Sequence, residues 1–329
     1  MKTLAVVIPV YNEEENLTVL YERLVAVLSR CDDVNASVIF VDDHSADRTP
    51  EILGSLATRD SRVRWLRLSR NSGSHTACAA GLDHSNTDAV IVMAADLQDP
   101  PELITQLLEK HGKGFQIVWA AREKREGESW FTIAASRCFY WLMKRLTDIR
   151  QPPDGADVFL VDRRVVDAFR QMPERNLSLF LAFSWLGFRQ ASISYVKEAR
   201  QAGESKWTVQ KKIILAIDSL VGFSYVPLRC MSYMGFLAAV LGVLWAGGLL
   251  ITKLFGITQT VGYASIMIAV LILGGIQMLM LGVLGEYLWR TLEESRRRPR
   301  YFVESSNLSK PAGQELENPS LRKPNAITE

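Results

Sequence analysis

Short segments that contain apolar residues alternate with longer segments along the first part of the chain. Leu4–Val10 is a continuous β-rich run, as expected for a strand buried on both faces of a sheet. The predicted strands cover Leu4–Val10, Ser37–Val41, Val63–Leu68, Ala89–Ala94 and Gln116–Ala120. The stretches between them cover Glu13–Ser29, Thr49–Thr58, Ser74–Asp83 and Pro101–Lys110. This alternation predicts an α/β domain with a mostly parallel sheet and helices on both of its faces.

The pattern changes near residue 230. Between residues 230 and 285 the only charged residue is Lys253. Two uncharged runs, Cys230–Thr252 and Leu254–Gly285, can each supply the ~20 apolar residues that a membrane-spanning helix needs. A buried hairpin in a soluble protein is the alternative, and uncharged runs of this length disfavour it. We therefore predict two spanning helices joined by a short link near Phe255–Thr260.

Basic residues flank the two predicted spans on both sides. They are Lys206, Lys211, Lys212 and Arg229 before the spans, and Arg290, Arg296, Arg297, Arg298 and Arg300 after them. The link between the spans has only Lys253 nearby, so the positive-inside rule places both flanks in the cytoplasm. The sequence thus predicts a multi-pass protein of the cytoplasmic (inner) membrane, with the α/β domain and both termini in the cytoplasm.

The segments on either side of the spans have patterns of their own. Residues 208–224 carry an apolar helical stripe that includes Val209, Ile213 and Ile217, which is typical of an interfacial helix. A helix packed in a protein core is an equal alternative on periodicity alone. The tail from Ser305 to Glu329 is polar and is predicted to be disordered. These patterns divide the chain at residues 1–206, 207–229, 230–289 and 290–329.

Composition narrows the classes of function. The net charge of +2 implies no strong field for a polyanion, and no sustained stripe of basic and aromatic residues is present. Nucleic-acid binding is therefore not expected. The four cysteines show no paired spacing, so reduced thiols are expected rather than a disulfide framework or a zinc site.

Polar side chains follow three of the predicted strands. Asn12 and Glu13 come after the first strand, Asp42 and Asp43 end the second, and Asp96 follows the fourth. In open α/β sheets ligands bind beyond the carboxyl ends of the strands, so these residues are expected around one crevice. The glycine patterns of a dinucleotide-binding fold and of a phosphate-binding loop are both missing from the sequence.

Asp96 and Gln98 are candidates for binding a divalent cation. A carboxylate and an amide at positions i and i+2 can offer oxygens to one hard cation, which completes its shell with water and phosphate oxygens. Such an ion would neutralise the charge that develops on a departing nucleoside diphosphate. The alternative is an acidic strand-to-helix turn in which Pro100 and Pro101 open a helix.

An ordered set of motifs makes the chain similar to a known family. The motifs are Val7-Ile8-Pro9-Val10-Tyr11-Asn12-Glu13-Glu14, Val41-Asp42-Asp43, Ser69-Arg70-Asn71, Gly73, Ala80-Gly81-Leu82, Asp96-Leu97-Gln98-Asp99-Pro100-Pro101-Glu102, Asp162-Arg163-Arg164, Ala202-Gly203-Glu204-Ser205-Lys206-Trp207 and Arg298-Pro299-Arg300-Tyr301. Together they resemble family 2 glycosyltransferases of the polyprenyl-phosphate type. These include dolichol-phosphate mannose synthase, bacterial polyprenyl-phosphate glucosyltransferases and the aminoarabinose transferase of lipid A. The resemblance covers nearly the whole chain except the tail.

The resemblance implies a Rossmann-like domain of the GT-A type and a role for each matched residue. The residues that it implies for the donor are Pro9, Tyr11, Glu13, Asp42, Asp43 and Lys206, and those for Mg²⁺ or Mn²⁺ and the diphosphate are Asp96 and Gln98. Lys206 would close over the donor phosphates; the alternative is a lysine that faces anionic lipid. The implied reaction transfers a sugar from a nucleotide donor, with inversion, to a polyprenyl phosphate.

The same resemblance places Asp157 near the acceptor as a catalytic residue, together with Asp96. Arg122 and Arg137 are candidates for the acceptor phosphate, because guanidinium groups pair well with phosphate oxygens. A solvated basic surface is the alternative for both arginines. A lipid phosphate has a second pKa of about 6 and needs little help from a base near neutral pH. Asp157 could therefore orient the acceptor or a basic partner instead.

Two positions depart from the family pattern. Ala94 stands where many members have the first aspartate of the metal motif, and Val158-Phe159-Leu160 stand where many have Phe-Arg-Leu. These changes keep open a catalytically weak, sugar-nucleotide-binding scaffold. A processive polysaccharide synthase is a second rival, but the Gln-x-x-Arg-Trp motif of such enzymes is absent from the sequence.

The resemblance also implies partners and a role for the spans. A UDP-sugar, undecaprenyl phosphate and a homo-oligomer, with a tetramer as one form, are what bacterial members of the family suggest. The polar candidates all precede residue 207, and the spans contain no ionisable residue other than Lys253 at their boundary. A functional site within the bilayer normally contains such residues, so the hairpin is predicted to be an anchor and an assembly element.

Overall fold

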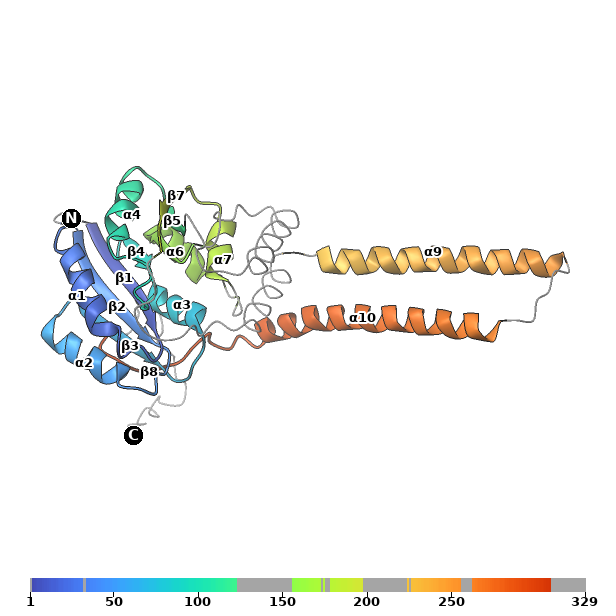
Figure 1. Cartoon of the computed structure of the whole chain (residues 1–329), viewed down its shortest axis with the longest axis horizontal. Coiled ribbons are helices and arrows are strands. Elements are labelled where there is room, and N and C mark those ends of the chain that lie inside the picture. The colour runs from blue at the N-terminus through green and yellow to red at the C-terminus, as the bar shows by residue number, and fades with distance from the viewer. Residues whose placement is uncertain are drawn as a thin grey trace, which may run out of the picture.

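The protein consists of an α/β domain and two long helices that extend away from it (Figure 1). The computed structural model describes residues 2–31, 34–122, 156–172, 174, 178–197, 224, 226–255 and 262–308. Five sets of residues with predictions lie outside these ranges: Arg137, Lys206 with its loop, residues 207–223, residues 256–260 of the predicted link and the tail beyond residue 308.

The α/β domain is built on an eight-stranded mixed sheet. Its strands are β1 (Lys2–Val10), β2 (Val34–Asp42), β3 (Val63–Leu68), β4 (Ala89–Val92), β5 (Ile117–Arg122), β6 (Val158–Asp162), β7 (Gln190–Tyr195) and β8 (Val303–Ser306). They lie in the order β7-β5-β6-β4-β1-β2-β3-β8. β1 pairs in parallel with β2 and β4, β2 with β3, and β5 with β7. β6 and β8 run antiparallel to their neighbours, so the predicted mostly parallel sheet is confirmed with two exceptions.

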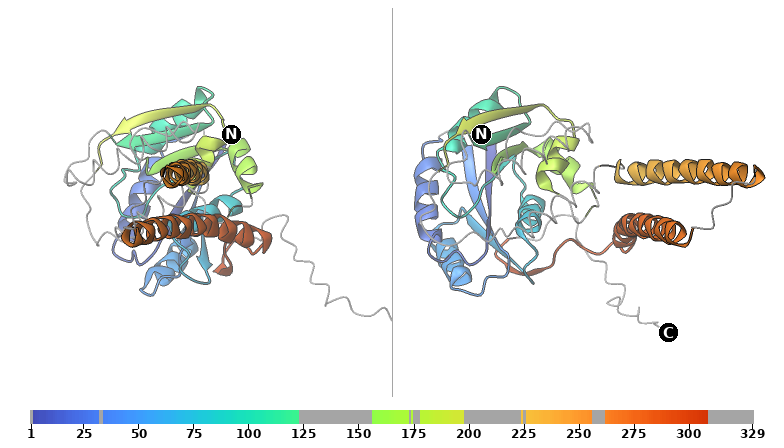
Figure 2. Two further views of the ribbon diagram at one scale, coloured as in Figure 1. Left: turned by 90° about the vertical axis from the view of Figure 1, so that its right-hand side faces the viewer. Right: turned by 45° about the vertical axis from the view of Figure 1, so that its right-hand side comes forward.

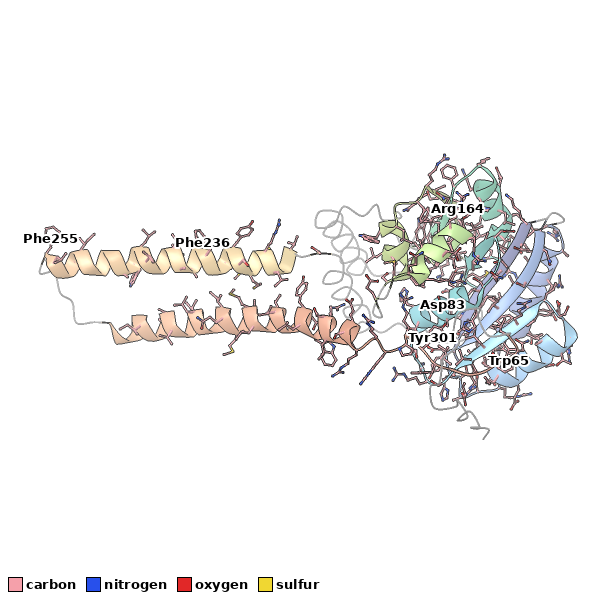
Figure 3. All side chains as sticks on the ribbon, turned by 180° about the vertical axis from the view of Figure 1, so that it is seen from behind. Trp65, Asp83, Arg164, Phe236, Phe255 and Tyr301 are labelled. Carbon is pink, nitrogen blue, oxygen red and sulfur yellow. The ribbon has the colours of Figure 1, made fainter. Side chains whose placement is uncertain are left out.

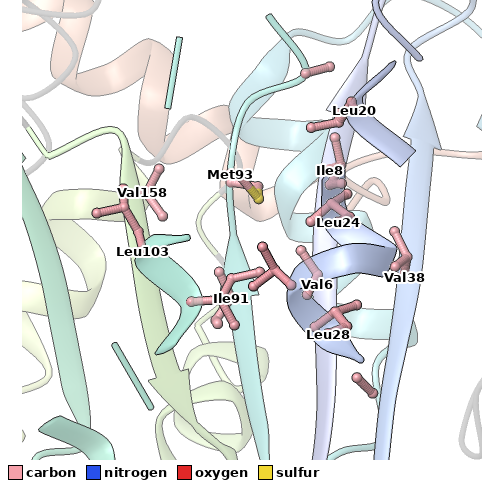
Figure 4. Packing of buried hydrophobic residues seen from close by; sticks show 14 of the residues in the cluster. Val6, Ile8, Leu20, Leu24, Leu28, Val38, Ile91, Met93, Leu103 and Val158 are labelled. Atoms are coloured by element: carbon pink, nitrogen blue, oxygen red, sulfur yellow. The ribbon is translucent and has the colours of Figure 1, made fainter. Parts of the chain in front are cut away.

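Helices cover both faces of the sheet, as predicted. They are α1 (Leu17–Leu28), α2 (Thr49–Arg59), α3 (Ser74–His84), α4 (Leu103–Gly112), α6 (Arg163–Arg170) and α7 (Leu179–Trp185). Buried residues of α1, α2 and α4 share one apolar core with the sheet, and those of α3, α6 and α7 share the other. Figure 4 shows Leu20, Leu24 and Leu28 of α1 against Val6 and Val38 of the sheet. The i, i+4 spacing of these leucines explains why the helix buries this face.

Gly81 brings α3 close to the sheet. A Cβ atom added at this position would lie 2.2 Å from Cγ1 of Val7 and 3.1 Å from Cγ2 of Val41. We expect Gly81→Ala to lower the free energy of unfolding by about 1–3 kcal/mol, because the helix must move off β1 and β2. Gly54→Ala in α2 is the matched control, since nothing lies within 4 Å of its added Cβ. Thermal denaturation of both variants checks this, and equal stability would contradict the close packing.

The long helices α9 (Val226–Leu254) and α10 (Tyr263–Ser295) run side by side (Figures 1 and 2). Both contain segments long and apolar enough to cross a membrane, Leu228–Gly248 and Ile268–Ser295, with mean hydropathy of 1.7 and 2.3. Their apolar side chains lie open on the outside: Phe236, labelled in Figure 3, is 72% exposed. The predicted pair of spans fits these helices, although α9 continues through Leu254, where the second span was predicted to begin.

The chain after α10 returns to the sheet. β8 pairs antiparallel with β3, and the Ser69 backbone N–H donates to the carbonyl of Phe302 at 2.9 Å. The Tyr301 hydroxyl donates to Oδ2 of Asp83 at 3.1 Å, and Figure 3 shows both residues on this side of the domain. The prediction of a disordered tail from Ser305 is therefore wrong for residues 305–308. Pairing covers the edge of β3, which would otherwise present unpaired backbone groups.

Candidate active site

The candidate residues lie along one edge of the sheet. β1, β2, β4, β5 and β7 all end there, and the antiparallel β6 begins there. Asp157, just before β6, therefore reaches the same edge as Arg122, which ends β5. This is the position where open α/β sheets bind ligands. The predicted gathering of polar residues at the strand ends is thus observed for the described candidates.

Asp42 is a buried carboxylate with two fixed partners. Its Oδ1 accepts a hydrogen bond from the Ser45 backbone N–H at 2.8 Å, and its Oδ2 accepts one from Nη1 of Arg67 at 2.9 Å. The Asp42 side chain is 1% exposed. A carboxylate oxygen has two lone pairs, so each oxygen has one lone pair beyond the one that accepts this hydrogen bond. Asp42 is thus held rigidly at the end of β2.

Asp43 connects the end of β2 to the start of α3. Its two oxygens accept hydrogen bonds from the backbone N–H groups of Ser72 and Gly73, at 2.7 and 2.8 Å. Burial raises the pKa of the Asp43 carboxyl, and the two backbone donors act against that shift. Gly73 has a φ of 89°, a left-handed conformation that favours glycine. These contacts give Asp43 a role in shaping the loop beside the predicted donor site.

The loop after β1 is locked against the loop after β2. Asn12, with φ of 51°, donates its backbone N–H to Oγ of Ser45 at 2.9 Å and accepts from the Ala46 N–H at 2.8 Å. The Glu13 N–H donates to Oγ1 of Thr49 at 3.0 Å. Pro9 stands opposite Val41 in the β1–β2 register, and Tyr11 follows in the bend. The predicted donor residues before residue 50 thus form one connected structure.

Asp96 and Gln98 lie on either side of a strained residue. Leu97 has φ of 58°, and a bulky side chain adopts this region at a cost of about 1–2 kcal/mol. The buried Leu97 side chain holds the turn in place. The Gln98 backbone N–H approaches Oδ1 of Asp96 at 3.3 Å. Backbone strain of this kind clusters at functional sites, which supports a functional role for this turn.

The donor set at Asp96 suits a cation that substrate helps to hold. Within the described ranges, no group of three or more His, Cys, Asp or Glu side chains could hold a metal ion. Asp96 and Gln98 are both partly exposed near this edge of the sheet. Mg²⁺ is commonly held by one or two carboxylates with water and phosphate oxygens. These residues therefore fit such an ion together with a bound diphosphate.

Two cations surround Asp157. Arg122 and Lys197 both form ion pairs with its Oδ2, and the Lys197 Nζ–Asp157 Oδ2 distance is 2.8 Å. The side chains of Arg122, Lys197 and Asp157 are 22%, 19% and 31% exposed. The alternative of a fully solvated basic surface does not hold for Arg122. A partly open pair of cations is a suitable place for a phosphate.

Asp99 lies deeper, behind this pair. Its Oδ1 accepts a hydrogen bond from the Tyr195 hydroxyl at 2.5 Å and lies 3.8 Å from Nζ of Lys197. Its Oδ2 is buried without a hydrogen-bond partner among the described residues. Burial raises the pKa of Asp99, and the neighbouring Lys197 acts in the opposite direction. Asp99 thus links the metal motif to the end of β7.

Four residues of this edge were missed by sequence reasoning: Arg67, Tyr195, Lys197 and Glu304. Tyr195 ends β7 and Lys197 follows two residues later, so the rule that placed Asp96 could have found Lys197 had β7 been recognised. Arg67 alternates with buried neighbours in β3, where it reads as an outward surface residue. Glu304 comes after the hairpin, whereas the polar candidates suggested by the sequence all precede residue 207.

Comparisons with known proteins agree with this arrangement. The family model "Glycosyl transferase family 2" matches residues 5–168, and "GtrB C-terminal hairpin" matches residues 226–290. An uncharacterized glycosyltransferase of Synechocystis sp. is 40% identical over 91% of this chain and 94% of its own. A prophage bactoprenol glucosyl transferase homolog of Escherichia coli is 35% identical over 91% and 98%. The bactoprenol glucosyl transferase of Shigella phage SfX is 36% identical over 92% and 99%.

The two family models together cover most of the chain from β1 to α6, all of α9 and most of α10. The family resemblance seen in the motifs is therefore confirmed, and so is the GT-A α/β fold. The two candidate spanning helices and the relatives named for bactoprenol suggest an association with a membrane. The protein is a glycosyltransferase enzyme that belongs to glycosyl transferase family 2.

Proposed function

We propose that this enzyme transfers a sugar from a nucleotide donor to a polyprenyl phosphate at the membrane surface. The observation that carries the proposal is the pair of cations, Arg122 and Lys197, at the same sheet edge as Asp42 and Asp96. This arrangement supports a nucleotide site and a separate phosphate site on one edge. Relatives named bactoprenol glucosyl transferase support a polyprenyl acceptor.

The donor is proposed to lie across the ends of β1, β2 and β4. Pro9, Tyr11, Glu13 and Asp42 would hold the base and ribose, and Asp43 would shape the neighbouring loop. Asp96 and Gln98 would hold Mg²⁺ or Mn²⁺, which would neutralise charge on the diphosphate. Ala94 leaves the ion one protein oxygen fewer than in many family members. A UDP-sugar remains our prediction for the donor, and Lys206 our prediction for a residue closing over its phosphates.

The acceptor phosphate is proposed to lie between Arg122 and Lys197, with Arg137 as a further predicted contact. A phosphate oxygen would attack the anomeric carbon while the bond from that carbon to the nucleoside diphosphate breaks. One displacement of this kind inverts the configuration at the carbon. The attacking oxygen is already largely deprotonated at neutral pH. Asp157, paired with both cations, would orient them for the acceptor rather than remove a proton.

Both termini are proposed to lie in the cytoplasm, where nucleotide sugars are available to the domain. α9 and α10 run side by side, and the domain-facing ends of both helices lie together, which supports one side for the α/β domain and the chain after α10. We expect a reporter that is active only in the cytoplasm to be active when it is fused at the C-terminus. A reporter that is active only in the periplasm should be active when it is inserted between residues 256 and 260. A periplasmic C-terminus would contradict the hairpin topology. A homo-oligomer, with a tetramer as one form, stays a prediction.

A screen of UDP- and GDP-sugars with undecaprenyl phosphate tests the proposed function. The full chain in lipid nanodiscs should form a glycosylated lipid phosphate with at least one UDP-sugar. Donor binding without transfer from any sugar would favour the catalytically weak scaffold, the second candidate, which the missing carboxylate at Ala94 motivates.

A further inference from the structure

Strand β8, which follows the membrane hairpin, is connected to the predicted nucleoside site through Arg67. Oε2 of Glu304, in β8, accepts a hydrogen bond from Nε of Arg67 at 2.9 Å. The same guanidinium donates from Nη1 to Oδ2 of Asp42 at 2.9 Å and from Nη2 to the Ser45 carbonyl at 3.1 Å. Arg67 thus joins a strand from beyond residue 300 to the carboxylate at the end of β2.

The sheet register explains why these groups meet. Asp42 of β2 stands opposite Arg67 of β3, and Arg67 stands opposite Ser305 of β8, next to Glu304. The Arg67 side chain is 20% exposed, so its direction is set by its three acceptors. Each acceptor holds a different nitrogen of the planar guanidinium. A guanidinium group is fixed in orientation when each of its nitrogens donates a hydrogen bond.

Glu304 also contacts the loop that follows Asp42. Its Oε2 lies 3.4 Å from Nδ1 of His44, a residue with φ of 64°. Nδ1 of His44 is also 3.1 Å from the Leu68 carbonyl. Glu304 therefore lies against both β3 and the loop that carries Asp43 and Ser45.

Docking of β8 does not depend on Glu304. Asn307 accepts from the Trp65 backbone N–H at 2.7 Å through Oδ1, and the Asn307 N–H donates to the Trp65 carbonyl at 3.2 Å. Tyr301 is tied to Asp83 at the other end of the segment. The Glu304 side chain is 49% exposed, and an ion pair this open adds little to folding stability. A role in strand docking alone therefore leaves its contact with Arg67 unexplained.

We propose that Glu304 is a positioning residue for the donor, acting through Arg67 on Asp42. This inference rests on the proposed role of Asp42 in holding the nucleoside. Glu304 balances the charge of Arg67 from the side away from Asp42 and fixes the plane of the guanidinium. Asp42 then presents its remaining lone pairs in one direction. The chain beyond the membrane hairpin is in this way part of the donor site, and nucleotide binding and β8 docking stabilise each other.

The test is UDP binding to the full chain in nanodiscs, measured by calorimetry, with donor KM and kcat measured beside it. We expect Glu304→Ala to weaken UDP binding and raise donor KM by about fivefold, with kcat and melting temperature nearly unchanged. Glu304→Gln keeps an acceptor for Nε and should lie between the wild type and Glu304→Ala. Glu51→Ala is the matched control, because Glu51 also pairs with an arginine, Arg48, but on the exposed surface of α2.

Hydrogen exchange provides a second readout that a structural role would not change. UDP should slow exchange in residues 303–306 of the wild type, and Glu304→Ala should lose this UDP-dependent slowing. Wild-type UDP affinity and donor KM in Glu304→Ala would overturn the inference while leaving the proposed function intact. The inference would also be overturned if Glu304→Ala lost UDP binding and, without nucleotide, lost protection from hydrogen exchange in β8 to the same extent. A wild type that binds no nucleotide would overturn both.

Discussion

Replacing Asp96 with asparagine is expected to lower the transfer rate by about 10²- to 10³-fold. Asparagine keeps the shape of the side chain and an oxygen that can accept from the Gln98 N–H. The substitution removes the one carboxylate among Ala94, Asp96 and Gln98, the three positions of the metal motif. The departing diphosphate would then develop charge without a neutralising ion. The measurement is single-turnover formation of glycosylated lipid by Asp96→Asn and the wild type.

Glu109→Gln is the control for this experiment, because Glu109 is an exposed carboxylate of α4 paired with Lys113. It should transfer at the wild-type rate. EDTA should abolish wild-type transfer, and added Mg²⁺ or Mn²⁺ should restore it. Ala94→Asp should tighten metal binding if the missing oxygen limits affinity. Full activity both in EDTA and in Asp96→Asn would show that the metal assignment is wrong.

The second large effect is expected at the two cations that surround Asp157. Lys197→Met and Arg122→Met should each raise the acceptor KM by about 10- to 100-fold, because a charged hydrogen bond to the lipid phosphate is lost. UDP binding should stay at its wild-type level, since neither residue is assigned to the nucleoside. Lys113→Met is the control, as Lys113 also pairs with a carboxylate but is 57% exposed just after α4. A change in donor KM alone would contradict the acceptor assignment.

Asp157→Asn separates the two roles that remain open for this residue. If Asp157 orients Arg122 and Lys197, the variant loses activity but keeps the shape of the wild-type pH–rate profile. If Asp157 removes a proton, the limb of the profile that reports its ionisation disappears. We expect the first result, because a lipid phosphate near neutral pH needs little help from a base.

The first half of the fold could be predicted because its signals are local. Strand β1 contains a continuous apolar run, and helices such as α1 place leucines at regular spacing. The rule that ligands bind beyond strand ends then placed Asp42 and Asp96 on one edge. Helix α1 begins at Leu17 rather than Glu13, because the carbonyl of Glu13 accepts from the N–H groups of Asn16 and Leu17 in a turn.

The rest depends on contacts between residues far apart in the sequence. β6 and β7 are short strands of five and six residues, and nothing local shows that β6 runs antiparallel between β4 and β5. β8 has four exposed residues in a polar segment, so its pairing with β3 has no periodic signature. Lys197 and Glu304 reach this edge of the sheet only through these pairings. Sequence reasoning therefore found the proposed nucleotide side of the edge more completely than the proposed acceptor side.

The return of β8 changes how the hairpin can be studied. The prediction that it serves as an anchor invites a truncation before α9, at about Val226. Such a truncation would also remove Tyr301, Glu304 and Asn307, which contact the α/β domain. Loss of activity would then report on the donor site as well as on the membrane. Variants of the full chain avoid this ambiguity.

The most direct test of the account compares two lipids that differ only in the phosphate. Nanodiscs with the full chain would contain either undecaprenyl phosphate or undecaprenol, and the lipid products formed from the active UDP-sugar would be measured by mass spectrometry. The account predicts a monoglycosylated lipid phosphate, formed in step with UDP release, and no product from the alcohol. Equal glycosylation of both lipids, or UDP-sugar binding with no glycosylated lipid, would contradict it.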